Sequence, residues 1–269
     1  MIKRIAVQHP LVFSFVVTLI YILMLIASSI LAANWPGEAY GQFLGGMVGR
    51  IISIIILVLI LNGLGWLGPA GFKQIGRWQI WLLLLPALIY TIAVTAYAMT
   101  GGFDFSIRNP QLTGVAATFI LIAAFLEEIT FRGLILYGLV NAWGRTGLAL
   151  IKSILVSALF FGAVHIVNVL SGQPLTDALL QSLVAFSLGI FLAAVVLSGA
   201  SIFPAVIFHG LLNLAGYLNL TSKNITETTS SWLLLSLLMV PLALFGLYQL
   251  KRTLVTSVTT EAVQRQQLT

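Results

Sequence analysis

Long apolar runs alternate along the sequence with short connections that are polar or rich in glycine and proline. Each run is close to the about 20 residues that a helix needs to cross a hydrocarbon core of about 30 Å. Turn-forming stretches such as Asn34–Gly37 and Ser171–Pro174 separate them. The pattern predicts an all-α, polytopic transmembrane helical bundle with about eight spans, at residues 11–33, 43–63, 79–99, 113–140, 148–170, 177–198, 202–219 and 231–250. Only a few residues join the sixth and seventh spans, so we expect one or both to be short or broken.

Composition excludes a soluble globular domain. Hydrophobic residues make up 59% of the chain and charged residues 7%, and the mean hydropathy is +1.07. A soluble domain has about 25% charged residues to cover its surface. The absence of cysteine excludes disulfides, thiolate metal ligands and a cysteine nucleophile. The net charge of +6 would suggest nucleic acid for a soluble protein, but here the basic residues lie mostly between apolar runs, so no nucleic-acid partner is expected.

The distribution of lysine and arginine predicts the topology. Basic residues favour the cytoplasmic side of a membrane. With eight spans and a cytoplasmic N-terminus, only Arg108 and Lys223 lie outside. The cytoplasmic set is much larger: Lys3, Arg4, Lys73, Arg77, Arg145, Lys152, Lys251, Arg252 and Arg265. Both termini are therefore predicted to be cytoplasmic.

No connection between spans is long enough to fold separately, so residues 1–269 are predicted to form one integral membrane domain. The first apolar run, 11–33, exceeds the apolar core of a signal peptide and is interpreted as an uncleaved span. Membrane lipid is the surrounding partner, and the compactness of the chain favours a multi-pass protein of the bacterial inner membrane. Any function must lie within the bundle itself.

A few ionisable residues fall inside the predicted spans: Arg50, Glu127, Glu128, Arg132, His165 and His209. Such residues are costly in a bilayer, face the bundle interior and mark functional sites. Glu128 and Arg132 are four residues apart, so they share a helix face and can pair. Glu127 points about 100° away, which leaves it free to act on water as a general base.

Two later spans add histidines with an amide nearby. His165 follows Phe161 by four residues, and Asn213 follows His209 by four. A histidine and an amide aimed into one cavity can donate hydrogen bonds to a developing oxyanion. Taken singly, each feature has a plainer interpretation: a structural ion pair, a histidine bonded to a neighbouring helix, or core packing for Phe161. Arg50 is assigned no catalytic role, so the hypothesis depends on the combination.

In order, the motifs Glu127-Glu128-x-x-x-Arg132, Phe161-x-x-x-His165 and His209-x-x-x-Asn213 resemble those of the CPBP intramembrane proteases. This family includes the CaaX prenyl endopeptidases of the Rce1 type and bacterial relatives linked to bacteriocin immunity. The resemblance covers about residues 113–219, which would form the catalytic core. It implies that Glu127 activates water and His165 helps to hold it. It further implies that His209 and Asn213 stabilise the oxyanion, while Glu128 and Arg132 fix the geometry.

The resemblance leaves the metal question open, since both a metalloprotease and a glutamate-type mechanism are argued for the family. Glu127, His165 and His209 could supply one oxygen and two nitrogens to a zinc ion or another divalent metal. Yet the sequence has no His-Glu-x-x-His helix. Glutamate and histidine acting directly on water would suffice, so metal-independent chemistry is favoured.

The leading hypothesis is an intramembrane endopeptidase acting on a membrane-associated or CaaX-like hydrophobic peptide or protein. The first alternative is a non-catalytic immunity or partner-binding protein that uses the same polar cavity. The second is a transporter, because intramembrane carboxylates also relay protons. The sequence shows no internal repeat to support a transporter, and the retention of every candidate group favours the enzyme.

Overall fold

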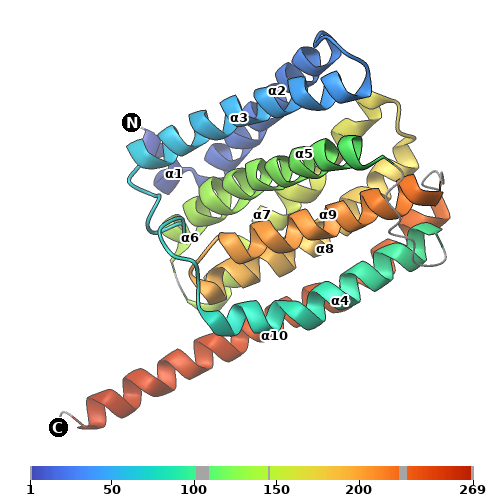
Figure 1. The fold of residues 1–269 in the computed structure, drawn as a ribbon. Helices are drawn as coiled ribbons and strands as arrows, with labels where there is room; N and C mark the ends of the chain where they lie inside the picture. Colours follow the sequence, from blue (N-terminus) through green and yellow to red (C-terminus); the bar gives the residue numbers. More distant parts are fainter. Residues whose placement is uncertain (1, 101–108, 145, 224–228, 268–269) are drawn as a thin grey trace.

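In a computed structural model the chain folds into helices that lie side by side, with the end of the last helix projecting from the bundle (Figure 1). The structure describes residues 2–100, 109–144, 146–223 and 229–267, without the side chains of 98–100, 219–223 and 254–267. All regular elements in these ranges are helical: α1 Ile2–Gln8, α2 Pro10–Ala33, α3 Ala39–Gly63, α4 Trp78–Thr100, α5 Pro110–Glu128, η1 Ile129–Leu136, α6 Tyr137–Trp143, α7 Gly147–Val164, η2 His165–Ser171, α8 Leu175–Gly199, α9 Phe203–Lys223 and α10 Thr229–Gln267. The predicted all-α class is confirmed.

Within the described residues, seven helical segments are long and apolar enough to cross a membrane: Pro10–Ala33, Ala39–Gly63, Trp78–Tyr97, Pro110–Trp143, Gly147–Ser171, Leu175–Gly199 and Thr229–Thr253. They correspond to seven of the eight predicted spans. The other prediction, 202–219, falls on α9, whose described apolar part, Phe203–Leu218, is shorter. The protein is a polytopic integral membrane helical bundle. The cytoplasmic location of both termini stays a prediction.

The outer surface of the bundle is apolar, as a lipid-facing surface must be. Phe15 on α2, Leu59 on α3 and Ile89 on α4 are all more than half exposed. In a bilayer these side chains contact acyl chains, where no hydrophobic penalty applies. The same exposure explains why the apolar runs show no polar stripe in the sequence.

Small residues bring α2 and α3 close together. A Cβ atom added at Gly49 would lie 2.7 Å from the Cα of Ser28, and one at Gly45 would lie 3.0 Å from the Cα of Ala32. The Ser28 hydroxyl donates a hydrogen bond of 3.0 Å to the Gly46 carbonyl across the same contact. Close approach through glycine and serine is a common way for membrane helices to pack, and here it fixes α3 against α2.

The predicted fourth span is one helical run from α5 through η1 to α6, but its middle is a π-helix, which the sequence did not predict. The Tyr137 N–H donates to the Arg132 carbonyl five residues earlier, and all residues of η1 are buried. A π-turn inserts an extra residue and turns the following side chains relative to the preceding ones, often at functional sites. Glu127 and Glu128 end α5 immediately before this change.

The connection from α3 to α4 holds the turn between α8 and α9. The Ile202 N–H donates to the Gly71 carbonyl (3.2 Å), and the Ser201 hydroxyl donates to the Gln74 carbonyl (2.6 Å). Gly71 has φ +91°, and a Cβ there would lie 2.9 Å from the Cα of Ser201. These contacts fix the start of α9, the helix that carries His209.

One acidic residue lies at the start of the predicted sixth span. Asp177 is in the first turn of α8 and is buried. The Thr229 hydroxyl at the start of α10 donates a hydrogen bond to it. The helix dipole stabilises a carboxylate in the first turn of a helix. The hydrogen bond with Thr229 makes Asp177 a link between α8 and α10.

Candidate active site

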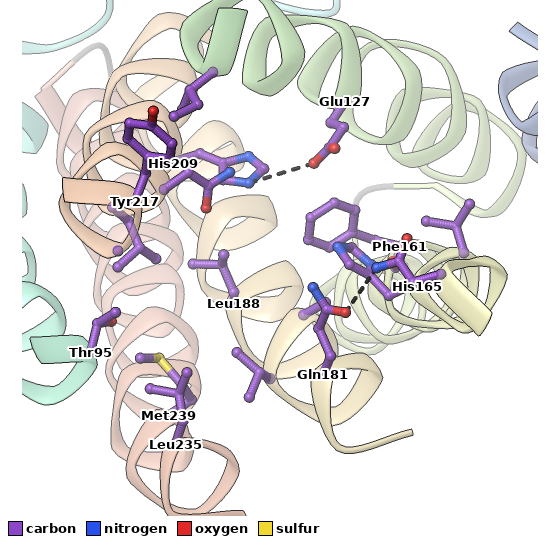
Figure 2. A pocket seen from close by; sticks show the side chains of 18 of the residues that line it. Thr95, Glu127, Phe161, His165, Gln181, Leu188, His209, Tyr217, Leu235 and Met239 are labelled. Atoms are coloured by element: carbon purple, nitrogen blue, oxygen red, sulfur yellow. Dashed lines mark hydrogen bonds and ion pairs between the residues drawn. The ribbon is translucent and has the colours of Figure 1, made fainter. Parts of the chain in front are cut away.

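A cavity of about 520 Å³ lies inside the bundle. Its volume is within the range of about 300–1,000 Å³ that is usual for ligand pockets. It lies where two core clusters meet: Phe161 and Val164 come from one, and Leu188, Leu212 and Trp232 from the other. Figure 2 shows Glu127 and His209 facing each other at one end of the cavity, whereas Leu235 and Met239 lie far from them. The cavity therefore has a polar end and an apolar end.

Glu127 lies at the polar end and reaches the cavity, with 19% of its side chain exposed. The Tyr21 hydroxyl on α2 donates a hydrogen bond of 3.2 Å to its Oε1. Its Oε2 lies 3.5 Å from Nε2 of His209. The carboxylate is thus held from two sides by different helices while part of it stays accessible. The predicted divergence of Glu127 from Glu128 is what the structure has.

Glu128 points away from the cavity into a sealed contact. Nη1 of Arg132 lies 2.8 Å from its Oε1, and both side chains have 0% exposure. Nδ1 of His209 lies 2.9 Å from the same oxygen. The Arg132 guanidinium also lies over the Phe161 ring, 4.4 Å from its centroid. The ion pair predicted from the four-residue spacing is present. Its carboxylate holds His209 on the side of the ring that faces away from the cavity.

His209 therefore bridges the two glutamates. A carboxylate only accepts hydrogen bonds, so Nδ1 of His209 carries the hydrogen in its contact with Glu128. Nε2 is then turned toward Glu127 and the cavity. A histidine whose far nitrogen is held by a carboxylate has a fixed ring orientation and tautomer, as in many catalytic and metal sites.

His165 is held in the same way by a different acceptor. α7 ends at Val164, and His165 begins the 3₁₀-helix η2. Its Nδ1 lies 2.9 Å from the Phe161 carbonyl oxygen, which can only accept, so Nδ1 is the donor. The ring lies edge-on to Phe161 and lines the cavity (Figure 2). Nε2 is the nitrogen left for another partner.

Amide side chains complete the polar lining. Asn213, one helical turn beyond His209 on α9, lines the same cavity and is exposed. Asn168 donates a hydrogen bond of 2.8 Å to Gln181 on α8, and both line the cavity. Of the six predicted site residues, four line the cavity together: Glu127, His165, His209 and Asn213. Glu128 and Arg132 lie behind them.

Sequence reasoning missed Tyr21 and assigned no catalytic role to Arg50. Tyr21 holds Glu127, and Arg50 on α3 lines the cavity. Tyr21 is separated from Glu127 by 106 residues, so no local spacing could pair them. The signal available was the presence of a hydroxyl and a guanidinium within apolar spans. Arg50 was noticed, but its partner helices were unknown.

The predicted metal ligands satisfy one requirement of a metal site and fail another. His165 and His209 each donate Nδ1–H to a protein acceptor, as zinc-bound histidines usually do. Across the part of the chain that the structure describes, however, no three His, Asp or Glu side chains are gathered closely enough to hold a metal ion. A metal at Glu127, His165 and His209 stays a prediction, and no step proposed below uses one.

Comparison with known proteins identifies the region that contains the site. A family model described as "Type II CAAX prenyl endopeptidase Rce1-like" matches residues 108–215. Searches of curated proteins and of solved structures found no match. The matched region includes all three motifs and runs from just before α5 into α9. The chain therefore has an Rce1-like region, and its resemblance to the CPBP intramembrane proteases is confirmed.

Proposed function

We propose that the protein is an intramembrane endopeptidase in which Glu127 activates the water that cleaves a peptide bond. The observation that supports this most directly is the contact between Glu127 and His209, whose far nitrogen is held by the sealed Glu128 carboxylate. A general base must be accessible, oriented and within reach of its substrate. Glu127 lies on the cavity wall and is held by Tyr21 and His209.

The proposed reaction needs only protein groups. Glu127 removes a proton from water as the water oxygen attacks the carbonyl carbon of the substrate. Nε2 of His165, as an acceptor, orients the same water. The carbonyl oxygen becomes an oxyanion that accepts hydrogen bonds from the Asn213 amide and from His209 when both of its nitrogens are protonated. Glu127 then returns its proton to the leaving amine, and the peptide bond breaks.

The proposed substrate is a membrane-associated peptide or a hydrophobic segment of a protein. The cavity lies among transmembrane helices, and much of its lining is apolar, including Leu25, Val184, Leu188 and Met239. An extended apolar peptide could pack its side chains against this apolar lining while its backbone reaches Glu127. The matching family is described as a CAAX prenyl endopeptidase, which also supports peptide cleavage as the activity.

The test compares membranes from cells that produce the wild-type protein with membranes from cells that produce Glu127→Gln, and identifies new peptide termini by mass spectrometry. We expect termini that appear with wild type and are absent with Glu127→Gln and with His165→Ala. Glu38→Gln, at an exposed position outside the cavity, is the control and should behave as wild type. Identical termini for folded wild-type and Glu127→Gln proteins at equal abundance would contradict the proposal and favour a partner-binding protein.

A further inference from the structure

Arg50 is a membrane-embedded cation without a carboxylate partner. It lies near the middle of α3, one of the membrane-spanning helices. Among the described residues, no carboxylate is within ion-pair distance of it; the buried arginine pair is the one between Arg132 and Glu128. A charged side chain at this depth is costly and, without a structural partner, indicates a functional role.

The contacts of Arg50 hold the guanidinium but do not saturate it. Nη1 donates to the Ser28 hydroxyl (3.1 Å) and to the Gly46 carbonyl (3.3 Å). The guanidinium lies over the Phe119 ring, 4.1 Å from its centroid. Nε is buried without a partner in the described structure. Of the five N–H groups of arginine, the two on Nη1 are used in these bonds and the one on Nε is enclosed, so the two on Nη2 remain for an acceptor.

Small residues keep the guanidinium in place. A Cβ at Gly46 would lie 2.8 Å from the Phe119 ring and 3.2 Å from Nη1 of Arg50. Because glycine is present, the side chain fits between α2, α3 and α5. Fixing a long side chain in advance reduces the entropy lost when it binds a ligand. The arrangement is therefore suited to recognition as well as to packing.

Arg50 is accessible from the candidate active site. It lines the same cavity as Tyr21 and Glu127, and it also lines a second hollow of about 420 Å³ between α2, α3 and α5. The negative charge of Glu127 acts on the guanidinium across the cavity but without direct contact, because the Glu127 oxygens contact Tyr21 and His209. A guanidinium without an ion-pair partner in a cavity of low dielectric attracts an anion, and the two Nη2 hydrogens can bond to a carboxylate.

We propose that Arg50 binds a carboxylate of the peptide substrate and thereby places the peptide bond to be cleaved close to that carboxylate. The inference rests on the proposed peptidase function and deepens it. A peptide offers two sources of this group: its free carboxyl terminus, or an Asp or Glu side chain near the scissile bond. The same guanidinium would discriminate against peptides in which the carboxylate is neutral.

The first experiment measures cleavage by the purified full-length protein in lipid nanodiscs. The probe is a pool of N-acetylated apolar peptides without acidic side chains, made once with a free carboxyl terminus and once with a terminal amide. We expect wild type to cleave the free-acid pool at least about tenfold faster, the size of effect of a charge-assisted hydrogen bond. Arg50→Gln should cleave both pools at the slower rate. Arg50→Lys should keep part of the preference, since it keeps the charge but loses the planar guanidinium.

A second peptide pair identifies the source of the carboxylate. Both members have a terminal amide, and one has Glu where the other has Gln. A preference for the Glu peptide that disappears in Arg50→Gln assigns the site to an acidic side chain instead of the terminus. Arg4→Gln, which removes an exposed cation on α1, is the matched control and should retain the preference. If wild type cleaves charged and neutral peptides equally, the proposal is overturned, and that comparison requires no variant to fold.

Binding separates failure of this inference from failure of the proposed function. The Glu127→Gln protein, which cannot cleave under the proposed mechanism, is titrated with fluorescent free-acid and amide pools. If Glu127→Gln binds the free-acid pool more tightly than the amide pool, and the double variant Glu127→Gln/Arg50→Gln does not, the inference is supported even if wild type cleaves no peptide. Equal binding of the two pools contradicts it even if wild type is an active peptidase.

Discussion

The protein has two arginines within its membrane helices, and their surroundings differ. Arg132 is sealed with Glu128 at 0% exposure, and the pair supports His209 from behind. Arg50 lies between an aromatic ring and two oxygen acceptors, has no carboxylate partner in the described structure, and lines the cavity. A paired, enclosed charge contributes to the scaffold, because removing its partner is costly. A charge that faces a cavity is available to a ligand.

The two glutamates divide in the same way. Glu128 is enclosed with Arg132 and His209, whereas Glu127, its neighbour in sequence, reaches the cavity. The enclosed residues, Glu128 and Arg132, therefore form a sealed wall that supports the site, whereas Glu127 lies on the cavity wall where a substrate would bind. Substitutions on the sealed wall should affect stability first, and substitutions on the cavity wall should affect activity first.

The largest effect is expected from breaking the sealed pair. Arg132→Met leaves the Glu128 carboxylate buried without its main cation, which costs about 3–5 kcal/mol of stability. The loss would be measured as a lower thermal unfolding temperature in detergent, with size-exclusion chromatography used to quantify the folded protein that remains after heating. The double variant Glu128→Gln/Arg132→Met removes both charges and should recover much of it. Wild-type stability in Arg132→Met, with Arg4→Met as control, would show that the pair is not structural.

The next effect separates chemistry from folding on the cavity wall. Glu127→Gln can still accept a hydrogen bond from Tyr21 but cannot take a proton from water. Cleavage should fall by about 10²–10⁴-fold, the usual contribution of a general base, while the unfolding temperature stays close to wild type. Initial rates on a substrate identified from membrane termini provide the measurement. Retained cleavage with normal folding would exclude Glu127 as the base.

A smaller effect is expected at the residue that holds Glu127 from α2. Tyr21→Phe removes the hydroxyl donor but keeps the ring, which packs edge-on against Phe131 with 5.3 Å between centroids. Loss of one hydrogen bond to a charged group corresponds to about 1.5–3 kcal/mol, or at least about tenfold in rate. Tyr40→Phe, at an exposed position on α3, should leave the rate unchanged. An unaltered rate in Tyr21→Phe would remove Tyr21 from the site.

The smallest expected effect tests the metal-free scheme. Treating the purified protein with a chelator, followed by dialysis, should leave the rate of peptide cleavage unchanged, because every proposed proton transfer uses Glu127. Elemental analysis of the same sample would show whether metal was removed. Loss of activity that returns on adding zinc would contradict the metal-free scheme and favour the predicted metal site at Glu127, His165 and His209.

Most of the fold and part of the site could be predicted from local spacing. Apolar runs identified seven membrane helices, because the thickness of the hydrocarbon core sets the length of each run. The Glu128–Arg132 pair followed from a separation of four residues. The π-helix Ile129–Leu136 did not follow, because tertiary contacts of a wholly buried segment, and not its residue preferences, determine where the helical hydrogen bonds shift.

The sequence by itself determined that the chain is a membrane bundle and which helices carry ionisable groups, since both depend on residue type and on spacing along one helix. Only the tertiary structure decided which groups meet. It brought Tyr21 from α2 and Arg50 from α3 to the cavity of Glu127, and it turned His209 between two glutamates. Such partners belong to different helices, and their distances depend on how glycines, turns and side-chain volumes set the packing of the whole bundle.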